Sequence, residues 1–388
     1  MTPKKIALFG CGTFAQQHYR ELKKRSGIEV SFLIDPSEQK CEALITAQGS
    51  IGEHQPGMFS SIDEFLAANV TYDAGIIVTP SNTHHRIALP LLLAGKHVYV
   101  EKPLTVSTQE TSELALAAAE HDSVFMVGAS RNMFVSYRAA AHAVGQKKIG
   151  DIVAYLFYTQ FSWEKNTADN WRQDPNNSGA GILADHSPHF NHYLFDSLGF
   201  VPAFAQYIDG KQGRTGVDIA AGYHLINKKK GTTALVLMDG VYSGEQRTEK
   251  IKIYGKKGTI TIEFRNGVEE AYLEQKGQRI VLDTTPAIEE LHSFGIHDPK
   301  SRPALIHNFV SQLLGETDKN ASPGYRGELP VRVTEAVKRS KEIGEHFSHK
   351  GTVTYHPLLE EDIMALDRKT IDPFVARGSR VELQLYDR

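Results

Sequence analysis

A short apolar strand that runs directly into a glycine-rich turn constrains this sequence more than any other feature. Ile6–Phe9 form a run long enough for a buried parallel strand, and GCGTFA at residues 10–15 follows at once. Residues 16–24 then have the composition of a helix. Strand, glycine turn and helix start are the context of a dinucleotide-binding fingerprint. The sequence therefore predicts a nucleotide site at this turn.

Each small residue of the turn has a predicted role. Gly10 permits the tight turn, and Gly12 lets the backbone approach the pyrophosphate closely because a Cβ there would clash. Ala15 lets the helix pack closely on the strand. The pyrophosphate is expected on the free N–H groups at the helix N-terminus, so Thr13 and Phe14 complete the predicted contacts of this turn.

An acidic residue ends the second predicted strand, residues 28–34 (IEVSFLI). Asp35 follows the second glycine of the turn at close to the spacing of roughly 20 residues at which a carboxylate meets the adenine ribose. Such a carboxylate binds the ribose hydroxyls and repels a 2′-phosphate, so Asp35 favours NAD as the cofactor. Ser37 and Lys40 are able to meet a phosphate, which leaves NADP open. A helix N-cap before Pro36 is a compatible structural role for Asp35.

Two later strands carry polar loops to one sheet edge. Ala74–Val78 runs into the loop at residues 79–84, and His97–Val100 runs into Glu101-Lys102-Pro103. Ligands of doubly wound sheets bind at the carboxyl ends of the strands. The cofactor contacts predicted from these loops are Thr79, Pro80, Asn82, His84, Glu101 and Lys102. Strand–helix units repeat through residue 130 and predict a Rossmann domain with a parallel, doubly wound sheet over residues 1–130.

The pattern changes after residue 130, because predicted strands then follow one another without helices between them. Such a succession predicts an α/β domain with a mostly antiparallel open sheet over residues 131–355. The predicted strands are Asp151–Trp163, Ala220–Ile226, Thr232–Tyr242, Lys250–Tyr254, Thr259–Phe264, Glu270–Leu273 and Arg279–Leu282. The predicted helices are Arg131–Lys147, Ile182–Leu198, Ala304–Leu314 and Val331–Glu345. Residues 356–388 are charged without a clear period and are predicted to be a tail that packs on a partner or stays loose.

Acid–base chemistry is predicted from a lysine and a helix of the second domain. Lys102 lies at the nucleotide edge, while Asp185 and His189 are four residues apart and share a face at helical spacing. Lysine, carboxylate and imidazole together can handle the proton of a hydroxyl-to-carbonyl oxidation. Trp171 and Arg172 are candidates for contact with a polar substrate, with packing and a surface charge as the alternative.

The block TPSNTHHRIALPLLLAGKHVYVEKPLTVS at residues 79–107 resembles a region of the Gfo/Idh/MocA family of NAD(P)-dependent oxidoreductases that ends in a Glu-Lys-Pro signature. Gly179–His189 is similar to the family's second signature, and the resemblance covers about residues 4–355. It implies that Lys102, Asp185 and His189 are the catalytic trio and also bind substrate. In the family the histidine is the acid/base, the lysine polarises the reacting oxygen, and the carboxylate orients the imidazole or binds substrate. A cis Lys102–Pro103 bond is implied as well.

The sequence departs from the family pattern beside the trio. His186 is next to the aspartate, Ser187 replaces the usual small residue, and His192 stands where an acid is often found. These changes leave the trio intact and put the substrate's identity in doubt. A metal site of Asp185 with the three histidines is an alternative, but the implied chemistry needs no metal and none is predicted.

Composition excludes several classes of function. A formal net charge of −3 provides no electrostatic case for nucleic acid or an anionic membrane. Two cysteines, Cys11 and Cys41, are too few for a disulfide framework or a four-ligand zinc site. No apolar run approaches the ~20 residues of a membrane span. The N-terminus leads directly into a strand without a signal peptide, so a cytoplasmic protein is predicted.

The resulting prediction is an NAD-dependent enzyme that oxidises a secondary hydroxyl, or reduces the ketone, of a sugar, sugar derivative or cyclitol. The family resemblance implies a homodimer or homotetramer formed through the open sheet face. One alternative is an NAD-dependent glycoside hydrolase that acts through transient oxidation. Another is a nucleotide-binding protein without catalysis, because a fold does not determine function.

Overall fold

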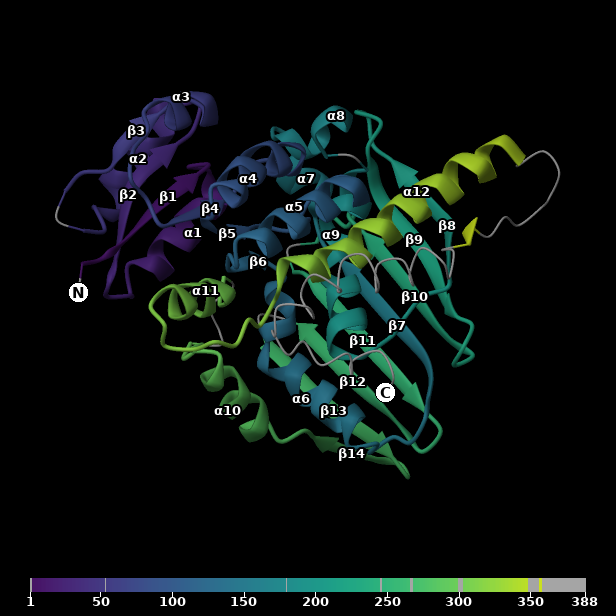
Figure 1. Cartoon of the computed structure of the whole chain (residues 1–388). Helices are drawn as coiled ribbons and strands as arrows, with labels where there is room; N and C mark the ends of the chain where they lie inside the picture. The colour runs from purple at the N-terminus through teal and green to yellow at the C-terminus, as the bar shows by residue number, and fades with distance from the viewer. Residues whose placement is uncertain are drawn as a thin grey trace. The chain divides into compact units, whose positions relative to one another are not determined.

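The computed structural model describes residues 2–52, 54–178, 180–244, 246–265, 268–298, 303–347 and 356–357. It contains two compact units, each with its own sheet and core (Figure 1). The first unit holds Met1–Met133 and Glu289–Glu328, and the second holds Phe134–Ile288 and the residues from Leu329 onward. Contacts thus group Glu289–Glu328 with the N-terminal residues. The predicted tail lies outside the described residues apart from His356–Pro357.

The first unit contains a six-stranded sheet in the order β3-β2-β1-β4-β5-β6, and every neighbouring pair is parallel. This order is that of a Rossmann sheet and confirms the predicted fold class. Its strands are β1 (Lys4–Phe9), β2 (Ile28–Ile34), β3 (Gly57–Phe59), β4 (Ala74–Ile77), β5 (His97–Val100) and β6 (Phe125–Val127). Its helices are α1 (Thr13–Leu22), α2 (Glu38–Gln48), α3 (Ile62–Ala67), α4 (His84–Leu93), α5 (Thr108–Glu120) and α11 (Leu305–Leu313).

The central strands of this sheet are apolar throughout because helices cover both faces. All four residues from Ile6 to Phe9 are fully buried, as are the four residues of β4. A run without alternation is what a parallel strand buried on two sides requires. The strand order reverses between β1 and β4, and the crevice at such a switch point is where doubly wound sheets bind dinucleotides.

The later part of the first unit closes the sheet beside β6. Val127 N–H donates to the Ser322 carbonyl at 3.0 Å, and the ring of Phe309 on α11 lies 5.8 Å from that of Tyr99. Gly324 packs so closely on Phe125 that a Cβ would lie 2.2 Å from the ring. Residues far apart in the sequence therefore share one core.

The second unit contains a nine-stranded sheet in the order β14-β13-β12-β11-β7-β10-β9-β8-β15. Its neighbouring strands are antiparallel except for the parallel pair of β7 and β10, which agrees with the predicted mostly antiparallel sheet. The strands are β7 (Ile152–Gln160), β8 (Phe204–Gln212), β9 (Asp218–Asn227), β10 (Thr232–Asp239), β11 (Thr248–Gly255), β12 (Gly258–Arg265), β13 (Val268–Gln275), β14 (Gln278–Val281) and β15 (His356–Pro357). The other α-helices are α6 (Val135–Gly145), α7 (Trp163–Thr167), α8 (Pro175–Ser178), α9 (Gly181–His192), α10 (Thr285–Ser293) and α12 (Glu328–Phe347), of which α10 and α12 also include residues of the first unit.

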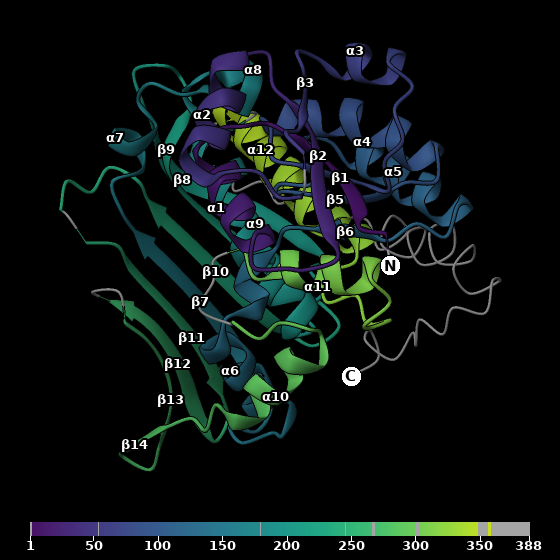
Figure 2. The same ribbon diagram turned by 90° about the vertical axis from the view of Figure 1, so that its left-hand side faces the viewer.

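One face of the second sheet is buried and the other is partly exposed. Burial alternates residue by residue along β10, as expected for a sheet covered on a single side. Figure 2 shows α6 and α9 on the same side of the strands, and both contribute to the buried core. The predicted open face is therefore present.

Several elements differ from the sequence predictions. The strand predicted to reach Trp163 ends at Gln160, and Trp163 begins α7. The predicted helix Ile182–Leu198 is α9 followed by a π-helical turn at Tyr193–Ser197. Sequence reasoning missed β8, because this strand lies next to the two-residue β15 near the sheet edge and its second half is exposed and polar.

Candidate active site

The first glycine of the N-terminal turn is required by the fold. Gly10 has φ of +90°, a conformation that L side chains rarely adopt, and a Cβ there would lie 2.6 Å from the Val78 carbonyl oxygen. The turn therefore lets the end of β1 approach the end of β4 closely. This is the tight turn that the sequence predicted.

The second glycine borders open space. Gly12 is the N-cap of α1, and among the described residues no heavy atom outside Gly12 and its chain neighbours lies within 4 Å of the position that its Cβ would take. The protein's own packing therefore does not require glycine here, whereas a ligand group held against the helix N-terminus would. Thr13 is exposed and Phe14 partly exposed beside this space, while Ala15 is buried against the sheet. The residues present thus fit a dinucleotide.

Asp35 is fixed over the same turn. Its two carboxylate oxygens accept hydrogen bonds from the backbone N–H groups of Cys11 and Ser37, both at 2.9 Å. Ser37 is the N-cap of α2, so Asp35 also stabilises the start of that helix. A carboxylate accepts about four hydrogen bonds, which leaves capacity for ribose hydroxyls. The N-cap role predicted for Asp35 is wrong, because the N-cap is Ser37 and the helix begins at Glu38, after Pro36. The contact of Asp35 with ribose stays a prediction.

The two cysteines meet beneath the turn. The Sγ atoms of Cys11 and Cys41 are 3.1 Å apart, and both thiols are free and buried. Burial raises the pKa of both thiols, which keeps them protonated. They act as small core residues, as the sequence suggested for Cys11.

The loop after β4 is held by its own hydroxyl groups and by a buried histidine. Thr83 Oγ1 lies 2.7 Å from both Thr79 Oγ1 and the Pro80 carbonyl oxygen. Pro80 and Asn82 are partly exposed on this loop. His84 is almost fully buried, and its Nε2 lies 3.0 Å from the Thr79 carbonyl oxygen. The loop is therefore shaped before any ligand binds.

His84 also reaches the loop after β5. Its Nδ1 lies 2.9 Å from the carbonyl oxygen of Pro103 and 3.2 Å from that of Leu104. Burial lowers the pKa of His84, although the neighbouring carbonyl groups oppose this effect. Both ring nitrogens thus face backbone within the protein, whereas the sequence placed His84 among the cofactor contacts.

Lys102 lies directly after β5 and is partly exposed, and its bond to Pro103 is cis, as the resemblance implied. Glu101 before it is buried and points inward. Glu101 Oε1 lies 2.8 Å from His18 Nε2 and accepts from the Tyr99 hydroxyl at 3.2 Å. Glu101 Oε2 accepts from the Lys102 N–H at 3.2 Å. Sequence reasoning missed His18, whose partner is 83 residues away.

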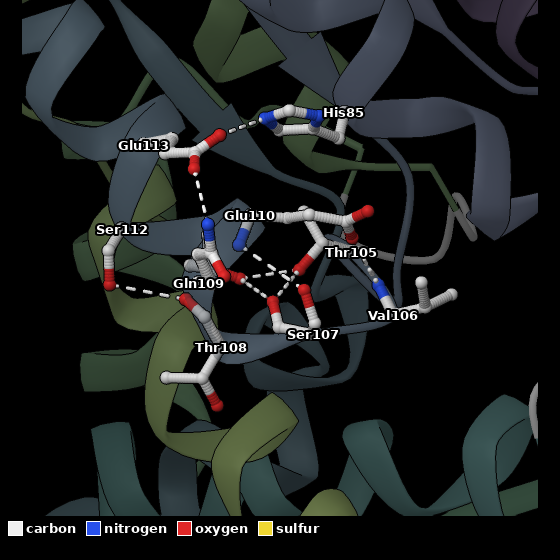
Figure 3. Close-up of polar contacts among 10 residues, drawn as sticks. His85, Thr105, Val106, Ser107, Thr108, Gln109, Glu110, Ser112 and Glu113 are labelled. Atoms are coloured by element: carbon white, nitrogen blue, oxygen red, sulfur yellow. Dashed lines mark hydrogen bonds and ion pairs between the residues drawn. The ribbon is translucent and has the colours of Figure 1, made fainter.

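The chain after Pro103 is fixed by the start of α5 (Figure 3). Ser107 Oγ accepts from the Glu110 N–H at 3.3 Å, and Glu110 Oε2 accepts from the Val106 N–H at 3.2 Å. Thr105 Oγ1 lies 2.6 Å from Thr111 Oγ1. This reciprocal capping gives the lysine segment a rigid C-terminal anchor.

In the second unit, α9 carries two of the predicted catalytic residues. The helix begins at Gly181, where φ is +57° and a Cβ would lie 2.3 Å from the Asp218 carbonyl oxygen. Asp185 and His189 are both partly exposed on a helix whose other residues are mostly buried. The face that Asp185 and His189 were predicted to share is thus the partly exposed face of α9 within this unit. Gly179, the first residue of the second signature, lies outside the described residues.

Asp185 brings together both predicted substrate residues. Its Oδ1 lies 3.3 Å from Arg172 Nε, and its Oδ2 accepts from the Trp163 indole N–H at 2.9 Å. The Arg172 guanidinium in turn lies 4.5 Å above the Trp171 ring. Trp163 was missed by sequence reasoning, because its role depends on a helix turn that the strand prediction excluded.

The neighbouring histidines have protein partners. His186 Nε2 lies 2.9 Å from Arg247 Nη2, and because arginine only donates, this nitrogen accepts. Arg247 also donates to Glu249 at 2.7 Å. His192 Nδ1 lies 3.0 Å from Asp196. Within the part of the chain that the structure describes, no group of three His, Cys, Asp or Glu side chains is placed to hold a metal ion.

The comparisons with known proteins identify the family of this chain. The chain matches the model of an oxidoreductase family with an NAD-binding Rossmann fold over residues 4–129, and the model of that family's C-terminal alpha/beta domain over residues 141–346. An uncharacterised oxidoreductase of Streptococcus pneumoniae is 26% identical over 68% of this chain and 69% of its own length. The 1,5-anhydro-D-fructose reductase of Ensifer adhaerens is 27% identical over 54% of this chain and 62% of its own length.

Solved structures share the fold. The WlbA dehydrogenase of Bordetella pertussis, whose structure holds NADH and UDP-GlcNAcA, has a TM-score of 0.73 at 19% identity and covers 92% of this chain and 98% of its own. No helix among the described residues has the length and apolar character needed to cross a membrane. The two family matches span most of the sequence and confirm the resemblance seen in its motifs. The chain belongs to the Gfo/Idh/MocA family of NAD-binding oxidoreductases.

Proposed function

We propose that this protein oxidises a secondary hydroxyl of a sugar, a sugar derivative or a cyclitol, or reduces the corresponding ketone, with NAD(H). The observation that carries the proposal is the accessible carboxylate–imidazole pair of α9, Asp185 and His189, with Arg172 bound to the carboxylate. The names of the relatives support this substrate class, since one reduces an anhydro sugar and another was solved with a nucleotide sugar acid.

The proposed catalytic groups are Lys102, Asp185 and His189, and all three also bind substrate. His189 exchanges the hydroxyl proton, and the Lys102 ammonium polarises the reacting oxygen. Asp185, fixed by Trp163 and Arg172, orients the imidazole or the substrate. Hydride exchange is the chemistry that NAD supplies when it is bound.

The cofactor is held by the turns of the first unit. The α1 N-terminus and the open space at Gly12 accommodate the pyrophosphate, and Asp35 binds the adenosine ribose. The carboxylate of Asp35 favours NAD over NADP because it would repel a 2′-phosphate. The partly exposed Pro80 and Asn82 extend this surface along the next loop.

We further propose that the protein acts in the cytoplasm as a homodimer or homotetramer. The partly exposed face of the second sheet supports the assembly, because alternate residues of β7 and β10 are only partly covered in the single chain. Leu156, Leu235 and Leu237 are apolar members of this face. Light scattering of the purified protein tests the oligomeric state.

The test of function is turnover. The purified protein is mixed with NAD and a panel of sugars, sugar acids and inositols, and NADH absorbance is followed. Lys102→Ala and His189→Ala should each lower kcat about 10²–10⁴-fold while leaving NADH affinity nearly unchanged. Wild-type turnover in both variants would exclude the assigned roles. Release of nitrophenol from nitrophenyl glycosides without net NADH formation would instead indicate the hydrolase, and tight NAD binding without turnover a protein that lacks catalysis.

A further inference from the structure

We propose that two buried histidines, His18 and His84, are positioning residues that hold the Lys102 segment to the two cofactor turns of the first unit. The proposal rests on the proposed function only for the role of Lys102. The hydrogen bonds that support it lie entirely within the first unit.

His18 holds the segment through the carboxylate of Glu101. Its ring is fully buried on α1, and its Nε2 lies 2.8 Å from Glu101 Oε1. Its Nδ1 is buried and has no hydrogen-bond partner among the residues that the structure describes. Because a buried N–H without a partner is costly, the proton is best placed on Nε2, where it is donated to Glu101. The same carboxylate accepts from the Lys102 N–H at 3.2 Å, so the Glu101 side chain connects the His18 ring to the Lys102 backbone.

The packing around Glu101 leaves its carboxylate little freedom. The Tyr99 hydroxyl donates to the oxygen that His18 contacts, at 3.2 Å, and the rings of His18 and Tyr99 are 5.4 Å apart. A Cβ at Gly128 would lie 2.6 Å from Glu101 Oε1. Glu101 therefore serves as a buried link between α1 and the lysine segment.

His84 holds the same segment from the other side. Its Nδ1 faces the carbonyl oxygens of Pro103 and Leu104, and its Nε2 faces that of Thr79. Carbonyl oxygens only accept hydrogen bonds, and a neutral imidazole has a single N–H. It therefore donates to the carbonyl groups on one side of the ring only. A proton on Nδ1 serves two carbonyl groups, whereas a proton on Nε2 serves one. The tautomer with its proton on Nδ1 therefore donates to more carbonyl groups, and it is the one that binds the lysine segment.

The two histidines lie on elements that follow the two cofactor turns. His18 is on α1, whose N-cap is Gly12, and His84 is the first residue of α4, directly after the loop at residues 79–83. The distance between Lys102 and each turn is thus set by a buried side chain as well as by the sheet. Positional control of this kind matters because a misplacement of about 1 Å can cost about 10²-fold in rate.

Asparagine and glutamine substitutions distinguish this role from simple packing. The amide nitrogen of asparagine lies near the position of Nδ1, and that of glutamine near Nε2. His18→Gln and His84→Asn should therefore keep the bond toward the lysine segment, whereas His18→Asn and His84→Gln should lose it. If the two histidines only filled space, the same substitution, either asparagine or glutamine, would be the better tolerated one at both positions.

The primary readout is hydrogen exchange of the Lys102 amide in the full-length protein. We expect exchange about tenfold faster in His18→Asn and His84→Gln than in His18→Gln and His84→Asn, since one hydrogen bond is worth about that factor. Once a substrate is known, kcat should be lower in His18→Asn and His84→Gln than in His18→Gln and His84→Asn. The Kd of NADH should stay within about twofold of the wild-type value. His85→Gln is the control, because His85 follows His84 but pairs with Glu113 (Figure 3).

The same asparagine–glutamine order at both positions, or unchanged exchange in all four variants, would overturn the proposal. The exchange experiment needs no substrate, so a failed proposed function appears separately, as a wild-type protein without turnover. If the His18 variants do not fold, Glu101→Gln tests the same link by removing the carboxylate, and it should speed Lys102 exchange. Wild-type exchange in Glu101→Gln would then count against the proposal.

Discussion

The two units fix their reactive side chains in different ways. In the first unit, Asp35 and His84 are held mainly by backbone groups of neighbouring turns. In the second unit, Asp185 and His186 are held by other side chains, which are the Trp163 indole, the Arg172 guanidinium and the Arg247 guanidinium. A site built on backbone depends on the shapes of turns, whereas a site built on side chains changes whenever one partner changes.

This difference matches the tasks that we propose for the units. NAD presents the same groups whatever the substrate, so the cofactor turns gain from being fixed by backbone. A substrate-binding surface has to vary, and pairs such as Arg172 with Asp185 can be replaced without altering the sheet. Substitutions should therefore affect folding most at the turns of the first unit and turnover most on α9.

The largest effect on stability is expected from Gly10→Ala. Its φ of +90° and the 2.6 Å approach of a Cβ to the Val78 oxygen mean that alanine must strain the backbone and push β1 from β4. The combined penalty is roughly 2–5 kcal/mol of unfolding free energy. Thermal and denaturant unfolding of the protein without cofactor measure it.

Gly12→Ala is the matched control for this change. Its φ is −74°, and its Cβ would meet no heavy atom of the described chain within 4 Å apart from its own neighbours in sequence. The unfolding free energy should therefore change by less than about 1 kcal/mol. NADH affinity should nevertheless fall by about tenfold or more, because the methyl group occupies the space assigned to the pyrophosphate. Equal destabilisation by the two substitutions would contradict the assignment of the open space to a ligand.

The sequence predicted much of the backbone-built region, because its signals are local or belong to a motif. The glycine turn and the apolar strands reflect constraints that act within a few residues, and the dinucleotide fingerprint gives the spacing to Asp35, which lies 24 residues from Cys11. His84 shows the limit of this reasoning. Its place in a loop at the sheet edge was evident, but its burial against Pro103 and Leu104 depends on the packing of two loops.

The side-chain-built region was predicted less completely. The i, i+4 spacing placed Asp185 and His189 on one side of α9, and Arg172 and Trp171 were recognised as candidates. Trp163 and Arg247 were missed because no motif fixes their spacing to partners that lie 22 and 61 residues away. Their contacts became visible only in the fold.

An intermediate effect is expected from Arg172→Gln. The substitution removes the cation at 3.3 Å from Asp185 and leaves the Trp163 bond in place. The arginine side chain is 30% exposed, so stability should hardly change. We expect kcat/KM to fall about tenfold, because Asp185 loses the guanidinium that helps to fix its carboxylate. Steady-state kinetics with the active substrate measure this change.

Arg214→Gln, an exposed arginine of the same unit, controls for the loss of charge and should retain wild-type kinetics. A drop of the same size in both variants would show that long-range charge, rather than the contact with Asp185, determines the rate.

The smallest effect is expected in the pH dependence of stability. Burial lowers the pKa of His84, His97 and His307 below the ordinary value of 6.5. As pH falls through 6.5, the unfolded chain therefore takes up protons that the folded chain resists, and the unfolding free energy decreases. It should be greatest above pH 6.5 and decline toward pH 5, with each histidine contributing at most about 1.4 kcal/mol per pH unit.

Denaturant unfolding at intervals between pH 7.5 and 5 tests this sign. His84→Asn lowers the stability at every pH because the smaller side chain leaves part of the buried imidazole site unfilled. It should also flatten the decline, since one resisting group is gone. His97→Gln should flatten it independently. A decline as steep in His84→Asn as in the wild type would mean that His84 is able to take up its proton in the folded state. The protonated imidazole would then donate hydrogen bonds to the loops after β4 and β5 at once. It would hold these loops more tightly than a neutral imidazole can.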